Sequence, residues 1–181
     1  MPKLATPRYL PNRPFPAYRH LPGQTPHPIK HPQGHSHHLH SRHLEIDYTG
    51  PPLTTQNWRQ HDAYLWGIDL YNHAYWWEAH EAWEGPWRLA AGIDALFLQG
   101  LIQTSAALVK WRQQKLSGQE KLYRKGQDKL QSVLAQTDTP IYMGLDLEIF
   151  LGRLARFLTL SSRTVDFESN IGLIGLELAR Q

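Results

Sequence analysis

The pattern of hydrophobic and polar positions changes at about residue 53. From there onward, apolar residues recur every three or four positions, which is the spacing of one face of an α-helix. The pattern predicts helices that include 64–71, start at 76, span about 92–114, start at about 117 and span about 146–160. We therefore expect an all-α fold, a compact bundle of about five helices.

Local signals place the ends of these helices. The first helix has Thr54, Thr55 or Asn57 as a candidate N-cap, and the stretch 72–74 is predicted to break the chain before the second. The second helix is expected to end or kink at the Gly-Pro pair 85–86, because a residue before proline avoids the α region. Ser-Gly-Gln-Glu at 117–120 is typical of a capping box that opens a helix. The apolar stretch 171–176 is expected to pack as a terminal segment.

Residues 1–52 form a different region, which we call the N-terminal arm, and residues 53–181 form the helical domain. The arm holds eleven of the thirteen prolines and eight of the eleven histidines. Proline lacks a backbone donor and fixes φ, so this stretch is expected to be extended. It is either a mobile tail or an arm laid over the domain, and its three aromatic residues between 9 and 18 favour the second.

Composition limits the classes of function. The chain has a net charge of +3, but six of its lysines and arginines and only two of its acids lie in residues 1–52. The helical domain therefore has no concentrated basic face, and nucleic acid is not the expected partner. No run resembles a membrane span or a secretion signal, and no cysteine is present. We expect a cytoplasmic protein without disulfides or thiolate chemistry, and no membrane partner.

The block 76–87 concentrates the polar chemistry of the helical domain. It packs three glutamates, one histidine and four tryptophans into twelve residues. At roughly 100° per residue, His80 is predicted to share a face with three indoles, those of Trp76, Trp83 and Trp87. Trp77 lies beside this face as a further aromatic wall.

The three glutamates of this block are predicted to point in different directions. Glu84 lies one turn from His80, so the two can act as an acid/base pair, or as metal ligands, although Glu84 can equally pair with Arg88. Glu78 and Glu81 point away from His80, and near a helix start they also complement the macrodipole without any function. His80 can equally be a hydrogen-bonded core histidine. Too few ligands share a face to predict a metal site from this block alone.

The next helix interrupts an apolar run with Gln99 and Gln103. These amides either form a narrow solvent-facing stripe or face the Glu/His block across a close approach at Gly100. Buried amides need partners, and carboxylates and an imidazole would supply them. The second alternative predicts a polar pocket shared by the two helices.

Two blocks of residues in this order resemble a known family. They are Tyr-Asn at 71–72 with Trp-Trp-Glu-Ala-His-Glu at 76–81, Glu84 and Trp87, followed by Leu-Gln-Gly-Leu-Ile-Gln at 98–103. They resemble domain-of-unknown-function family 309, over roughly residues 60–135. The resemblance implies a small helical fold with a site at these blocks and no known activity. The chain departs from the family pattern at Ala74, where glycine is usual, and at Pro86.

The arm adds candidate metal ligands. Its histidines include i+2 and i+4 spacings suited to Ni²⁺, Cu²⁺ or Zn²⁺, and the candidates are His27, His31, His35, His37, His38 and His40. They form either a neutral tail with adventitious affinity or a divalent-metal site. In a third alternative, His27 or His35 folds back over the Glu/His helix and completes a site of mixed origin.

Three functions follow from these residues. The first is a domain that binds a small molecule or ion, with ligand-binding residues Glu78, His80, Glu81, Glu84, Trp77, Trp87, Gln99 and Gln103. The second is an enzyme, most plausibly a hydrolase, that uses His80 with Glu84 or Glu81 as an acid/base pair. The third is a structural or interaction protein, in which the cluster is a buried hydrogen-bond network and the arm docks a protein partner. A pocket open to solvent favours the first two, and a dry, fully paired cluster favours the third.

Overall fold

The computed structural model describes residue 6, residues 8–37 and residues 48–161. The helices are η1 (Trp58–Gln60, a 3-10 turn), α2 (Asp62–Asn72), α3 (Trp76–Leu89), α4 (Gly92–Arg112), α5 (Leu116–Leu134) and α6 (Leu147–Ser161). A two-residue antiparallel pair, β1 (Ile141–Tyr142) and β2 (Leu145–Asp146), precedes α6. The mostly helical fold with five packed α-helices confirms the predicted class. The terminal stretch 171–176 lies outside the described residues.

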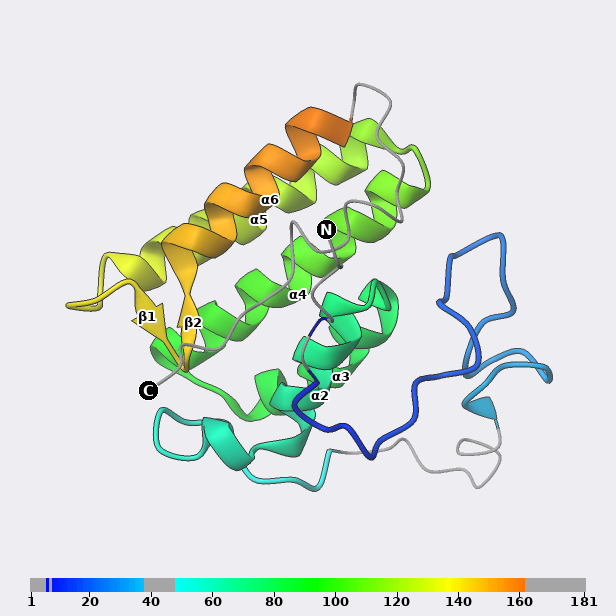
Figure 1. The fold of residues 1–181 in the computed structure, drawn as a ribbon, viewed down its shortest axis with the longest axis horizontal. Helices are drawn as coiled ribbons and strands as arrows, with labels where there is room; N and C mark the ends of the chain where they lie inside the picture. The colour runs from blue at the N-terminus through cyan, green and yellow to red at the C-terminus, as the bar shows by residue number, and fades with distance from the viewer. Residues whose placement is uncertain (1–5, 7, 38–47, 162–181) are drawn as a thin grey trace.

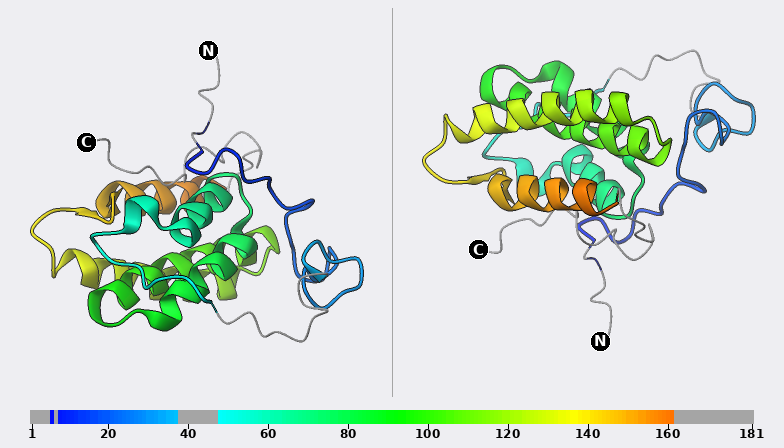
Figure 2. Two further views of the ribbon diagram at one scale, coloured as in Figure 1. Left: turned by 90° about the horizontal axis from the view of Figure 1, so that it is seen from below. Right: turned by 90° about the horizontal axis from the view of Figure 1, so that it is seen from above.

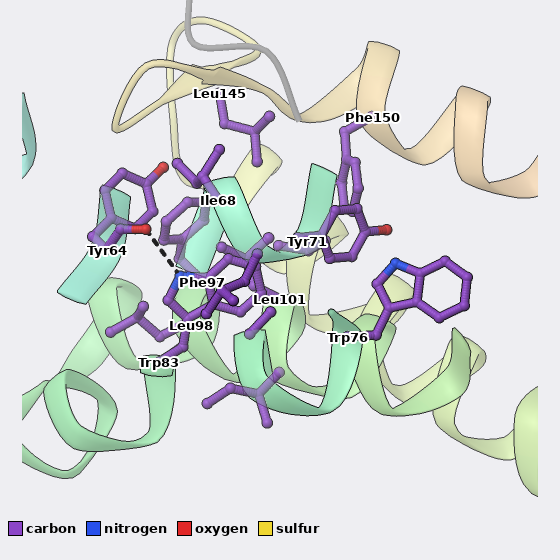
Figure 3. Packing of buried hydrophobic residues seen from close by; sticks show 14 of the residues in the cluster. Tyr64, Ile68, Tyr71, Trp76, Trp83, Phe97, Leu98, Leu101, Leu145 and Phe150 are labelled. Atoms are coloured by element: carbon purple, nitrogen blue, oxygen red, sulfur yellow. Dashed lines mark hydrogen bonds between the residues drawn. The ribbon is translucent and has the colours of Figure 1, made fainter. Parts of the chain in front are cut away.

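The helices pack in chain order. Helix α3 lies between α2 and α4, and α4 runs alongside α5 (Figure 1). Helix α6 lies in a second layer across from the α4/α5 pair (Figure 2). The core is built from large side chains of α2, α3, α4 and α6, and among those in Figure 3 are Tyr64, Ile68, Tyr71, Trp83, Phe97, Leu98, Leu101 and Phe150.

One close approach between α2 and α3 depends on a glycine. A Cβ atom placed on Gly67 would lie 2.1 Å from Nε1 of the Trp83 indole, so only glycine fits there. The same indole donates its N–H to the Tyr64 carbonyl oxygen at 3.2 Å (Figure 3). Helix α3 is joined to α4 by Ser105, whose hydroxyl donates to the Trp76 carbonyl at 3.0 Å. These contacts fix the orientation of α3 about its own axis.

The structure corrects three predicted helix ends. The N-cap of α2 is His61, whose ring Nδ1 accepts the Tyr64 N–H, and not Thr54, Thr55 or Asn57, because η1 intervenes. Helix α3 does not end at its proline: it continues through Pro86 to Leu89. A proline removes only one backbone donor from a helix, and the Pro86 residue is itself buried.

The capping box at 117–120 is also wrong. Helix α5 begins one residue earlier, at Leu116, and its N-cap Lys115 makes no side-chain capping bond. The break at 72–74, by contrast, is confirmed, since α2 ends at Asn72 and α3 begins at Trp76. Ala74 takes a positive φ of 62° there, the conformation that favours the glycine usual at this position in the family it resembles.

Helix α4 has the length and the apolar composition of a membrane-spanning helix, although its sequence did not suggest one. In the described fold, 56% of its most apolar window is buried inside the protein. Packing against α3 and α5 therefore accounts for much of its apolar surface.

The described part of the arm lies against the helical domain, at the end of the molecule away from the β1–β2 pair (Figures 1 and 2). Leu21 of the arm is part of the core, and the Phe15 ring stacks on Tyr75 with centroids 5.0 Å apart. Asp69 of α2 is completely buried and accepts the backbone N–H groups of Tyr9 and Leu10 at 2.7 and 2.8 Å. The arm is thus held by both apolar packing and charge-assisted hydrogen bonds.

Candidate functional site

The buried face of α3 differs from the predicted one. Trp76, Ala79, Trp83 and Pro86 face the core, whereas the side chain of His80 is 25% exposed. The buried stripe runs through the small Ala79, and the neighbouring imidazole lies at the partly exposed edge of this stripe. His80 therefore shares a helix side with Trp76 and Trp83 but not their burial, and the alternative of a core histidine is wrong.

His80 lies between two carboxylates on the partly exposed side of α3. Its Nδ1 is 3.3 Å from Glu81 Oε1, and its Nε2 is 3.5 Å from Glu84 Oε1. The prediction that Glu81 points away from His80 is therefore wrong. The side chains of Glu81 and Glu84 are 36% and 29% exposed. One ligand atom from each of the three residues lies within 4.8 Å of the others. We call His80, Glu81 and Glu84 the His80 group; it is open to solvent and is not a dry network.

Arg88 also contacts this group. Its guanidinium lies 3.4 Å from Glu84 Oε2, and it is mostly exposed. The i,i+4 pair considered from the sequence is thus formed. Because it uses Oε2, it leaves Oε1 of Glu84 directed at the imidazole.

Glu78, on the same helix, is buried, whereas the His80 group is partly exposed. It is only 6% exposed, and its Oε1 accepts the His20 backbone N–H at 2.7 Å and lies 3.2 Å from His35 Nε2. Burial raises the pKa of Glu78 above the ordinary glutamate value, and the bond from the His20 N–H opposes this shift. Glu78 therefore anchors the arm, a role that the macrodipole argument did not suggest.

Three arm histidines surround this carboxylate and the neighbouring indole. The rings of His20 and His27 meet the Trp77 ring edge-on, with centroids 4.8 and 5.5 Å apart. Burial, followed by repulsion from His27 and His35, lowers the pKa of His20. His35 thus folds back over the Glu/His helix, as the third alternative for the arm proposed. That this contact forms part of a binding site built from both the arm and the helical domain stays a prediction.

The other arm histidines divide into two sets. His31 and His37 are described and make local contacts within the arm, for example between His37 Nδ1 and the Ile29 carbonyl oxygen at 2.8 Å. His38 and His40 lie outside the described residues. Within the described residues, the His80 group is the one set of three histidine or acidic side chains with ligand atoms gathered this closely. The metal prediction for the arm stays untested.

A cavity of about 750 Å³ lies between the arm and helices α2 and α3. Four of the predicted ligand-binding residues contribute to its wall: Trp77, Glu78, Glu81 and Glu84. Its lining does not include His80, Trp87, Gln99 or Gln103. The imidazole of His80 is therefore not part of this cavity's wall, although Glu81 and Glu84, which contact it, are.

The two glutamines do not meet the Glu/His helix in the predicted way. The close approach at Gly100 is to α5, where an added Cβ atom would lie 2.6 Å from the Leu130 side chain. Gln103 is half-buried, and its Oε1 has no hydrogen-bond partner among the described residues. The predicted approach of α4 to α3 at Gly100 is wrong, and membership of Gln99 and Gln103 in a site stays a prediction.

Sequence reasoning missed several residues around the cavity. Arg13 and Asp62 line it, while His20 and Asp69 fix the arm beside it. Asp69 carried a signal, since it stands between Ile68 and Leu70 on the buried side of an apolar helix. A buried acid there needs donors from elsewhere in the chain.

The match to a family model covers the elements that form this site. Residues 64–122 match Domain of unknown function (DUF309). The chain contains a DUF309 domain. In this chain the matched span runs from α2 into α5 and includes Glu78 and the whole His80 group. The search of curated proteins finds no match. The arm lies outside the matched DUF309 span, although it forms one wall of the cavity.

Proposed function

We propose that the DUF309 domain of this chain binds an ion, a divalent metal, through His80, Glu81 and Glu84. One observation carries the proposal: a nitrogen and two carboxylate oxygens from one helix converge within 4.8 Å of one another. Imidazole and carboxylate are ligands for Zn²⁺ and its first-row neighbours, which bind such atoms at about 2.0–2.2 Å. Glu81 and Glu84 contact different nitrogens of the ring, so one carboxylate must change its side-chain conformation for all three residues to bind one ion.

The partial exposure of the group supports a labile metal rather than a structural one. Three protein ligands leave coordination positions for water or a substrate, as in catalytic zinc sites. The side chains of the group are between a quarter and a little over a third exposed, so an ion can reach them from solvent.

The pair between Arg88 and Glu84 does not prevent metal binding. An exposed ion pair of this kind contributes at most about 1 kcal/mol, and it uses the other carboxylate oxygen. Removing the guanidinium would make the site more negative. Arg88→Ala should therefore strengthen metal binding slightly.

Isothermal titration of the full chain with Zn²⁺, Ni²⁺ and Mn²⁺ tests the proposal. The arm histidines can also bind these ions, so the titration is run in a His37→Gln, His38→Gln, His40→Gln background. Binding should persist in that background and weaken about tenfold or more when His80→Ala is added. Glu120→Gln serves as the matched control, because Glu120 is an exposed glutamate on α5 paired with Arg124 at i+4. Equal affinities with and without His80 would refute the proposal.

A further inference from the structure

The cavity between the arm and α3 has a buried acceptor in its wall. The side chain of Glu78 is 5% exposed, and its two contacts with the arm are both made by Oε1. Its Oε2 has no hydrogen-bond partner among the described residues. A buried oxygen without a partner lowers the stability of the fold, more so if it is charged. Since Glu78 lines the cavity, a donor bound there can supply the missing bond.

The charges around the cavity favour a cation. Its acidic residues outnumber its arginines, since Asp62, Glu78, Glu81 and Glu84 face Arg13 and Arg88. Both arginines already have partners in the structure. The Arg13 guanidinium lies 4.5 Å from the centre of the Trp66 ring, and Arg88 contacts Glu84.

The rest of the wall suits the carbon skeleton of an organic molecule. The wall contains the indole rings of Trp66 on α2 and Trp77 on α3, and the phenol ring of Tyr48. Aromatic faces attract organic cations, and the volume falls in the range of small-molecule pockets. A bare metal ion would leave most of this space unused.

From these observations we infer that the cavity binds a small organic amine, whose ammonium group donates a hydrogen bond to Glu78 Oε2 while its carbon chain lies along the indoles. His35 and other arm residues form one wall beside it. The inference goes beyond the proposed metal site. The two sites share Glu81 and Glu84, which line the cavity, so the amine is tested with metal ions removed. The arm then contributes one wall of the ligand site in addition to packing on the domain.

Titration calorimetry of the full chain with cadaverine, in EDTA, tests the inference. The uncharged analogue of equal length, pentanediol, is the matched ligand. Cadaverine should bind at least about tenfold more tightly than pentanediol, because the diol lacks the charge that Glu78 requires. This comparison needs only the wild-type chain. Equal affinity of the two ligands, or no measurable binding of cadaverine, would overturn the inference and leave water as the partner of Oε2.

Two variants then locate the amine. Glu78→Gln keeps an acceptor for the His20 N–H but loses the charge, and it should weaken cadaverine binding about tenfold or more. Glu120→Gln should leave the affinity unchanged. Tight cadaverine binding by folded Glu78→Gln protein would contradict the assignment of Oε2. Loss of metal binding in His80→Ala with cadaverine binding intact would separate this site from the metal site.

Discussion

The carboxylate of Glu78 accepts the backbone N–H of His20 at 2.7 Å, a contact between residues 58 positions apart. With Asp69, which accepts two further backbone N–H groups of the arm, it joins a proline-rich segment to the helical domain through buried acids. Residues 8–36 of the arm lie outside helices and strands, so their backbone donors need other acceptors, and buried carboxylates satisfy such donors strongly. The two acids therefore determine where the wall of the cavity lies.

Asp69→Ala should lower the free energy of unfolding by about 3 kcal/mol, because two buried backbone N–H groups lose a charged acceptor. Urea denaturation measures the loss, and hydrogen exchange at the Tyr9 and Leu10 amides should accelerate. Asp128→Ala, at an exposed position on α5, is the control and should change the stability by less than about 0.5 kcal/mol. Unchanged amide protection in the Asp69 variant would show that packing alone holds the arm.

The raised pKa of Glu78 predicts a pH dependence. The native state binds the Glu78 proton more tightly than the unfolded chain, so this residue's contribution to stability is present below the ordinary value of 4.5 and is lost as the pH rises towards the raised pKa. Glu78→Gln cannot ionise. Its free energy of unfolding, measured by urea denaturation across the mildly acidic range, should fall less with rising pH than that of the wild type. Parallel curves for the two proteins would contradict the assignment.

Gly67→Ala should destabilise the fold by about 2 kcal/mol or more, because its Cβ atom would overlap the Trp83 indole. Gly152 of α6 provides the matched control, since no atom lies within 4 Å of a Cβ atom placed there. Gly152→Ala should instead stabilise the protein by about 0.5–1 kcal/mol through helix propensity. Thermal or urea denaturation of both variants measures the two changes in stability, which should have opposite signs. Equal changes would mean that α2 and α3 are not this close.

The sequence predicted the helices better than their ends. Apolar periodicity is repeated over many residues, so five helices could be recognised. The N-cap at His61 and the start of α5 at Leu116 each depend on the conformation of one or two residues, which a repeated apolar pattern does not record.

The orientation of α3 shows why the site was only partly predictable. The residues of the His80 group were all named, yet His80 was assigned to the face with Trp76 and Trp83. Hydrophobicity made the indoles the obvious core face, whereas the buried stripe of α3 passes through Ala79 and leaves His80 at its partly exposed edge. The role of Glu78 depends on His20, a contact too distant in sequence for any periodic pattern to reveal.

The most direct test of the proposed metal site is to locate the ion. Crystals of the full chain grown with Zn²⁺ should show an anomalous difference peak about 2.0–2.2 Å from an imidazole nitrogen of His80 and from oxygens of Glu81 and Glu84. A peak at the arm histidines without one at α3, or no peak at either place, would contradict the proposal.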